Sequence, residues 1–254
     1  MKIGINDFVP PIFYRTVSFL NRKLKQYNNG IIRLAPFNGI PKNVNVKWVL
    51  DVGANVGDVA VNALKSYPHS QVICFEPVQA TYSILSARLE PYSNRAHIFQ
   101  CALSDKNEAG EINITTFHGA NSISPQAKFH QDCNPHVREL GREKIKLVRL
   151  DDFAVNFPSQ KIDVLKIDVE GHELSVLKGG IQFISKNVDV IIIEIALMRD
   201  HSWSNQAVFD IFSLLNEAGF CLINVMDLHH AEDYEMLLVQ MDCVFRHKSQ
   251  MMLG

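Results

Sequence analysis

The sequence of 254 residues contains no apolar run near the roughly 18 residues that a membrane-spanning helix needs. Its first residues also lack the uninterrupted apolar segment and the small-residue cleavage site of a signal peptide. The cysteines form no C-x-x-C pair, and most of them lie in apolar, strand-like runs: Cys74, Cys101, Cys133, Cys221 and Cys243. These absences predict a cytoplasmic protein without a transmembrane segment and with reduced core cysteines.

A strong net charge is missing as well. The formal net charge is -2, and charged residues make up 20% of the chain, so nothing draws it globally toward nucleic acid or an anionic membrane. There is no internal repeat and no low-complexity tract. We therefore expect one large α/β domain that acts on a small-molecule or glycan acceptor and not on nucleic acid. No feature of the sequence indicates an oligomeric state.

The first 46 residues differ in character from the rest. Residues 8–24 mix aromatic residues and leucines with basic residues, which predicts a short basic amphipathic helix in an N-terminal helical extension, 1–46. Such a helix could pack across a cofactor site, contact another copy, or dock weakly on a membrane surface beside a lipid-linked acceptor.

From Lys47 to residue 254, strand-like and helix-like segments alternate, which predicts a mostly parallel sheet in a Rossmann-like α/β domain. Seven strands are expected, and the last arrives without a preceding helix, which suggests an antiparallel edge strand. The expected strands cover 47–52, 71–76, 96–101, 162–167, 188–194, 219–224 and 237–245, and the expected helices cover 57–66, 78–90, 173–185 and 204–217.

An insertion is expected between the third and fourth strands. The runs 111–117 and 146–150 could pair as an added hairpin above the carboxyl ends of the sheet. Between them, residues 119–141 have weak periodicity and many polar side chains, as a substrate lid would.

The turn after the first strand is the most informative stretch. A dinucleotide fingerprint needs a second glycine two residues after Gly53, where this chain has Asn55, and a third where it has Asp58. An aspartate there would face phosphate charge, so a pyrophosphate is disfavoured. The pattern around Gly57 instead suits a ligand with positive charge and no phosphate, such as S-adenosylmethionine.

An acid ends the second strand. Glu76 lies 25 residues after Asp51 and precedes Pro77, a spacing at which a carboxylate binds the two hydroxyls of a ribose. A tight turn that binds nothing is the alternative. A nicotinamide-dependent oxidoreductase is a weaker one, since Asn55 and Asp58 oppose it.

Four titratable side chains follow the fourth strand. In an extended segment, Asp168, Glu170 and His172 would point to one side, and a histidine beside carboxylates can accept a proton. The alternative is that Asp168 caps the next helix and the glutamates merely occupy its first turn. On the neighbouring strand, Glu194 is expected to face the cleft or to have a partner such as His172 or Arg199.

Two short motifs complete the candidate site. Leu103 and Asp105 follow the third strand, where an adenine ring would lie. Asp105 could accept a hydrogen bond from the exocyclic amine of adenine. A plain turn that binds nothing is the alternative. Asn121 and Ser122 in the expected lid offer polar groups that could orient a hydroxylated acceptor or the methionine end of the cofactor.

Taken together, these motifs resemble the FkbM family of S-adenosylmethionine-dependent methyltransferases. The resemblance covers roughly residues 47–245 and rests on Leu50 to Gly57, Phe75-Glu76-Pro77, Ala102 to Asp105, Asn121-Ser122, Leu150 to Phe153 and Leu165 to Glu173. It implies a class I methyltransferase fold, a three-layer sandwich, and O-methylation of a hydroxyl on a sugar or a polyketide. The cofactor is then expected at Asp51, Gly53, Asn55, Gly57, Glu76, Pro77, Leu103, Asp105 and Asp168.

The expected mechanism is an in-line displacement by an acceptor oxygen. His172 is the expected base, oriented by Asp168 or Glu170. In the rival mechanism, Asp168, Glu170 and Glu194 hold Mg²⁺, which acidifies the hydroxyl. A non-catalytic scaffold that binds the cofactor is the non-enzymatic alternative. The acceptor is expected to be a sugar of a surface glycan or glycolipid, or a secondary metabolite, bound near Asn121, Ser122 and Glu194.

Overall fold

The computed structural model describes residues 37–123, 137–197, 206–231 and 237–251. The expected amphipathic helix at 8–24 and most of the expected lid, 124–136, lie outside the described residues. Contacts within the chain separate Met1–Asn38 from Gly39–Gly254. The fold below is that of the second unit.

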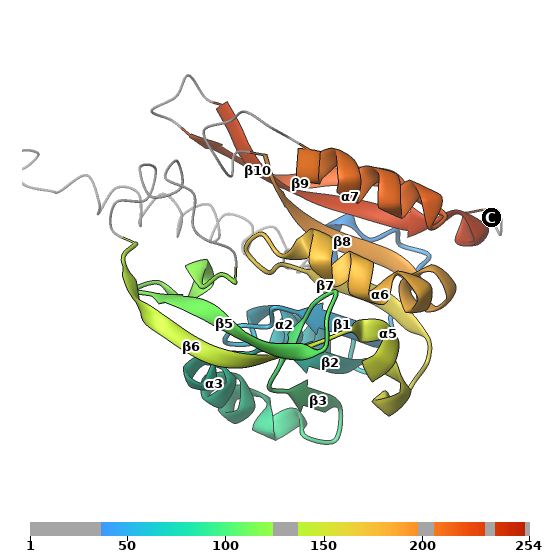
Figure 1. Cartoon of the computed structure of the whole chain (residues 1–254). Helices are drawn as coiled ribbons and strands as arrows, with labels where there is room; N and C mark the ends of the chain where they lie inside the picture. Colours follow the sequence, from blue (N-terminus) through green and yellow to red (C-terminus); the bar gives the residue numbers. More distant parts are fainter. Residues whose placement is uncertain (1–36, 124–136, 198–205, 232–236, 252–254) are drawn as a thin grey trace, which may run out of the picture. The chain divides into compact units, whose positions relative to one another are not determined.

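The main sheet has seven strands in the order β3-β2-β1-β7-β8-β10-β9 (Figure 1). The first five of these are mutually parallel, whereas β10 runs antiparallel to both of its neighbours. The expectation of a seven-stranded, mostly parallel sheet is confirmed. The strands are β1 (Trp48–Val52), β2 (Gln71–Phe75), β3 (Ala96–Phe99), β7 (Ile162–Ile167), β8 (Val188–Ala196), β9 (Phe220–Ala231) and β10 (Leu237–His247).

The sequence suggested an antiparallel strand at the edge of the sheet, and this position is wrong. The antiparallel strand is β10, and it lies between β8 and the edge strand β9. The helix between β8 and β9 makes a crossover, so β9 runs parallel to β8. No helix is described between β9 and β10. Strand β10 runs antiparallel to β9 and lies between β9 and β8.

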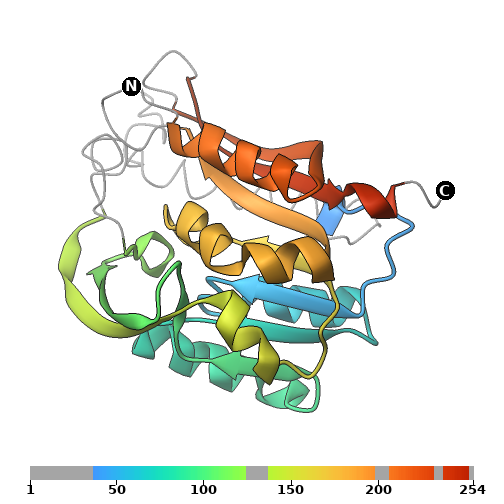
Figure 2. The same ribbon diagram turned by 45° about the vertical axis from the view of Figure 1, so that its right-hand side comes forward.

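Helices cover both faces of this sheet, which gives the expected three layers (Figure 2). Helices α6 and α7 pack on β8 and β9 on one face, and α2 packs on β1 and β2 on the other. The change of face occurs between β1 and β7, where ligands bind in open α/β sheets. The helices are α2 (Asp58–Ser66), α3 (Gln79–Leu89), α5 (Leu150–Phe153), α6 (Glu173–Asn187) and α7 (Gln206–Glu217), with 3-10 turns at Phe37–Gly39, Glu90–Tyr92, Ala154–Asn156 and Lys248–Gln250.

A second, three-stranded sheet is inserted after β3. Its strands are β4 (Ala102–Leu103), β5 (Glu108–Thr115) and β6 (Glu139–Val148), in the order β4-β6-β5. The antiparallel β5–β6 pair confirms the expected hairpin, although β6 begins before the run foreseen at 146–150. The 3-10 turn η3 (His118–Ala120) follows β5.

The core is built from strand residues that point to both faces of the main sheet. Strands β7 and β8 are buried on both faces, as their continuous apolar runs require. Cys74, Cys101 and Cys243 are free and buried, as expected for core cysteines. None of the described helices has both the length and the apolar character needed to cross a bilayer.

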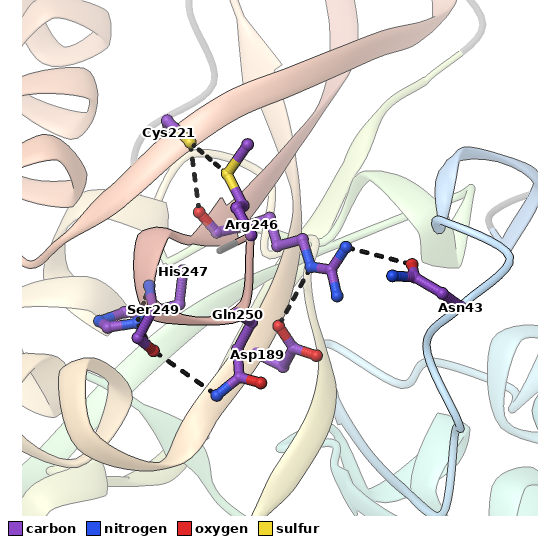
Figure 3. A network of polar contacts seen from close by, with 8 residues as sticks. Asn43, Asp189, Cys221, Arg246, His247, Ser249 and Gln250 are labelled. Atoms are coloured by element: carbon purple, nitrogen blue, oxygen red, sulfur yellow. Dashed lines mark hydrogen bonds and ion pairs between the residues drawn. The ribbon is translucent and has the colours of Figure 1, made fainter. Parts of the chain in front are cut away.

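The amino ends of the parallel strands carry a polar network (Figure 3). The Arg246 guanidinium pairs with Asp189 at 3.4 Å and donates to Asn43 at 3.2 Å. Nearby, Asp163 accepts from the backbone N–H groups of Lys47 and Trp48. These contacts fix the start of β1 against β7 and β8.

Candidate active site

A cavity of about 300 Å³ opens at the carboxyl ends of β1, β2, β7 and β8, beneath the second sheet. This is the edge of an open α/β sheet at which ligands bind. The residues foreseen from sequence that line it are Gly53, Asn55, Glu76, Pro77, Leu103, Asn121, Asp168, Glu170, His172 and Glu194.

The turn between β1 and α2 forms one wall of the cavity. Gly53, Asn55 and Gly57 all have positive φ, of 82°, 50° and 89°. A Cβ on Gly53 would lie 1.9 Å from the backbone oxygen of Asp168, so only glycine allows β1 and β7 to approach this closely. Asn55 Oδ1 is buried and has no hydrogen-bond partner among the described residues, which suits a ligand donor.

Glu76 closes the same wall from the end of β2. Its side chain is 6% exposed, and its Oε2 accepts from the Asn55 backbone N–H at 2.9 Å. Its Oε1 accepts from the Val78 N–H at 2.9 Å and from the Thr81 hydroxyl at 2.7 Å. Burial raises the pKa of Glu76, and these hydrogen bonds oppose that rise. The acid therefore lies against the cavity with its orientation fixed.

The segment after β7 turns sharply instead of staying extended. Glu170 and Gly171 have positive φ, of 50° and 98°. The buried Glu173 accepts from the Gly171 N–H at 2.8 Å, so this acid holds the turn in place. The turn brings Glu170 and His172 into the cavity lining beside Asp168.

Three carboxylates meet in the cavity. One oxygen from each of Asp168, Glu170 and Glu194 lies within 4.8 Å of the others. Burial, and then Asp168 and Glu170, raise the pKa of Glu194 well above its ordinary value. Glu194 lines the cleft, as expected, but its hydrogen-bond partner is the Gln240 amide of β10; Arg199 lies outside the described residues.

A buried lysine lies beneath these acids. Lys166 Nζ contacts Asp168 at 3.2 Å and Asp242 at 3.5 Å. Burial acts to lower its pKa, but the surrounding carboxylates outweigh burial and raise it. Lys166 is therefore a fixed positive charge that partly neutralises the cluster.

His172 is the residue before α6, and it contacts Ser104, which follows β4 of the second sheet. Its Nε2 lies 2.9 Å from the Ser104 hydroxyl oxygen. Ser104 also donates to Asp105 at 3.2 Å. The structure adds Ser104 as a hydrogen-bond partner of His172, and the orientation of His172 by Asp168 or Glu170 stays a prediction.

Four of the residues expected at the site do not line the cavity. Asp51 is buried on β1, with Lys166 as its neighbour in β7. Gly57 is the residue before α2, and Asp105 is exposed and accepts from Ser104. Ser122 donates to the Glu170 backbone oxygen at 2.6 Å, so it ties the second sheet to the turn after β7. These residues support the cavity from outside.

The sequence reasoning missed a rim formed by the second sheet and η3. Phe117, His118 and Gly119 line this rim, together with Ile112 and Ile123. Phe117 is 56% exposed, and its ring stacks on His118 with centroids 5.5 Å apart. A Phe-His pair just before the expected lid was the available signal, but only the paired sheet shows that it lines the same cavity as the turn between β1 and α2.

The family comparison matches this architecture. The model of the Methyltransferase FkbM domain matches residues 51–222, which contain the turn between β1 and α2, the second sheet and the strand ends around the cavity.

Curated relatives match a large part of the same region. "Methyltransferase sdnD" of Sordaria araneosa is 31% identical over 157 residues, covering 52% of this chain and 60% of that protein. "2-O-methyltransferase NoeI" of Sinorhizobium fredii is 30% identical over 146 residues, covering 54% and 59%. "Hexuronic acid methyltransferase AglP" of Haloferax volcanii is 29% identical over 195 residues, covering 75% and 69%. The chain thus spans less than two thirds of the first curated relatives that it matches.

A solved structure shares the fold. The crystal structure of Methyltransferase FkbM from Methylobacillus flagellatus KT superposes with a TM-score of 0.51 at 16% identity, covering 84% of this chain and 47% of that one. The likeness confirms the methyltransferase fold expected from the sequence.

Proposed function

The chain belongs to the FkbM methyltransferase domain family, and we propose that it transfers the methyl group of S-adenosylmethionine to a hydroxyl oxygen of a sugar. The observation that carries this proposal is the pairing of a buried acid with a histidine in one cavity. Glu76 and the glycine turn form its cofactor side, and His172 and three carboxylates line the same cavity.

The cofactor side fits S-adenosylmethionine group by group. Glu76 is the acceptor for the two ribose hydroxyls, because its carboxylate is held at the cavity wall. The unpartnered Asn55 Oδ1 accepts from a hydroxyl or from the ammonium group. Leu103 and Pro77 offer apolar surface to the adenine ring. Asp168 and its neighbouring acids favour the positive charge of the ligand.

When bound, S-adenosylmethionine supplies a methyl group on a positively charged sulfur. His172 would take the proton of the acceptor hydroxyl, so that the oxygen becomes a better nucleophile toward that methyl group. The cavity walls hold the two partners in line and exclude water. A positioned base of this kind contributes about 100-fold to 10,000-fold to the rate.

The acceptor side supports a sugar hydroxyl. Glu170, Glu194 and Asn121 provide hydrogen-bonding groups, and Phe117 provides an exposed aromatic face at the rim. Two relatives carry names that concern 2-O-methylation and a hexuronic acid. The apolar side chains of Ile112 and Ile123 favour the second candidate acceptor, a less polar secondary-metabolite hydroxyl.

A divalent cation is the rival to His172 as the group that activates the acceptor. The oxygen donors of Asp168, Glu170 and Glu194 are of the kind that Mg²⁺ prefers. Lys166 already neutralises Asp168, and Gln240 already donates to Glu194, and both contacts favour the histidine as the activating group.

Methyl transfer from labelled S-adenosylmethionine to a panel of sugar glycosides and of aliphatic and polyketide alcohols tests the proposal. We expect turnover with a glycoside, no loss of activity in EDTA, and a drop in kcat of about 100-fold to 10,000-fold in His172→Gln. Loss of activity in EDTA that Mg²⁺ restores would favour the cation. Binding of the cofactor without turnover on any acceptor would favour a scaffold.

A further inference from the structure

We propose that Ser104 is a positioning residue for His172, and that Asp105 in turn orients the Ser104 hydroxyl. The inference rests on the proposed role of His172 as the base. The three groups form a chain: Asp105 Oδ1 lies 3.2 Å from Ser104 Oγ, which lies 2.9 Å from His172 Nε2. No sequence motif pointed to Ser104 in this role.

The direction of these hydrogen bonds follows from the number of protons. A serine hydroxyl has one hydrogen, and an ionised carboxylate can only accept. With the single hydrogen of Ser104 donated to Asp105, the Ser104 oxygen accepts from His172, and the proposed tautomer of His172 then carries its proton on Nε2. A neutral imidazole with a proton on Nε2 has its basic lone pair on Nδ1.

This arrangement prepares the histidine for proton transfer. The acceptor proton goes to Nδ1, and the ring becomes an imidazolium. The bond from Nε2–H to Ser104 is the same before and after the transfer, so Ser104 and Asp105 need not rearrange. The opposite tautomer, with Nδ1 protonated, would have no lone pair there to take the proton.

The surroundings hold Ser104 in place. Its side chain is 2% exposed, and its backbone N–H donates to the Val148 oxygen at 2.9 Å. A Cβ on Gly179 of α6 would lie 1.8 Å from the Ser104 backbone oxygen, so glycine lets the helix contact this residue directly. His172 immediately precedes the same helix. One helix thus fixes both ends of the Ser104–His172 contact.

The test is the tautomer of His172, measured by NMR on the full chain labelled with 15N at histidine, with His172→Gln used to identify the signal. We expect neutral His172 to carry its proton on Nε2. Ser104→Ala and Asp105→Ala should both increase the Nδ1-protonated form. Asp105→Asn keeps an acceptor oxygen, so its population of the Nε2-protonated tautomer should be closer to that of the original protein. Ser70→Ala is the matched control, since it removes another buried serine hydroxyl, one that bonds the Ala63 oxygen away from the cavity.

Kinetics gives the second readout. Ser104→Ala should lower kcat about 10-fold to 100-fold, with the KM for S-adenosylmethionine and the affinity for S-adenosylhomocysteine unchanged. A dominant Nδ1–H tautomer in the original protein, or a tautomer that Ser104→Ala and Asp105→Ala leave unchanged, would overturn the proposal. If no acceptor is methylated, the proposed function fails, while the tautomer still decides whether Ser104 controls His172.

Discussion

The two sides of the cavity are built in different ways. On the cofactor side, Gly53, Asn55 and Glu76 are held by backbone geometry and by hydrogen bonds to a buried acid. On the acceptor side, Phe117 and His118 belong to a turn attached to a separate sheet, and the Phe117 ring is largely exposed. We therefore expect substitutions on the cofactor side to lower the stability of the fold. Substitutions of exposed side chains on the acceptor side should lower it little.

The acceptor side still has an ordered backbone. Asn121 Oδ1 accepts from the Thr115 N–H at 2.8 Å, and the Thr115 hydroxyl donates to the Phe117 oxygen at 2.7 Å. Asn121, foreseen as an acceptor-binding residue, therefore also closes the loop that presents Phe117. The division of labour suggests that a constant cofactor site can serve different acceptors through changes in this loop.

The largest expected effect comes from Gly53→Ala. The new Cβ would meet the Asp168 backbone at 1.9 Å in a left-handed conformation, so we expect a loss of about 4 kcal/mol of unfolding free energy. Urea denaturation measures this change in unfolding free energy. Gly110→Ala is the control, because its Cβ would meet only the flexible Leu147 side chain. Equal stability of the two variants would contradict the close approach of β1 and β7.

The next effect is a pH dependence of stability from Asp51. Burial raises the pKa of this carboxyl from 3.8 to about 7, and Asp168 and Glu76 add to the rise while Lys166 opposes it. Because the folded chain binds this proton more tightly than the unfolded chain, the contribution of Asp51 is complete below about pH 4 and is lost as the pH rises through 7.

Asp51→Asn removes this titration. Relative to the original protein, we expect the variant to gain about 2 to 3 kcal/mol of unfolding free energy between pH 5 and pH 8. Chemical denaturation at several pH values measures the change. A parallel pH dependence in both proteins would show that Asp51 is already ionised at pH 5.

The smallest effect is expected on the acceptor side. Phe117→Ala should raise the KM for a glycoside acceptor about 3-fold to 10-fold, with kcat and cofactor affinity unchanged, because one aromatic face is lost. Phe209→Ala is the matched control, since Phe209 lies on α7 and is 66% exposed. A fall in cofactor affinity in Phe117→Ala would erase the distinction between the two sides.

The difference between the cofactor side and the acceptor side also explains which features of the site could be predicted from the sequence. Gly53 and Glu76 were foreseen because a tight turn demands glycine and a ribose demands an acid at a fixed spacing. The mostly parallel sheet followed from the alternating pattern of strands and helices, but the place of β10 did not, since pairing partners at the end of a sheet leave no periodic signal. Asp51 and Ser122 do not line the cavity, and the sequence pattern could not show this because it does not reveal which face of a strand or loop meets the cavity.

Ser104 and Phe117 were beyond sequence reasoning for a related reason. Each depends on contacts between segments far apart in the chain: Ser104 contacts His172 in front of α6, and Phe117 lines the cavity beside the β5–β6 sheet. The carboxylates of Asp168, Glu170 and Glu194 were foreseen together because Asp168 and Glu170 follow β7 and Glu194 lies near the end of β8, and the carboxyl ends of these adjacent parallel strands must meet.

The most direct test of the central claim is isothermal titration of S-adenosylhomocysteine into the original protein and into Glu76→Gln. We expect micromolar binding by the original protein and a loss of about 100-fold or more in Glu76→Gln, because a fixed carboxylate on two ribose hydroxyls contributes about 3 kcal/mol. Binding that is unchanged in Glu76→Gln, or absent in the original protein, would contradict the placement of the cofactor in this cavity.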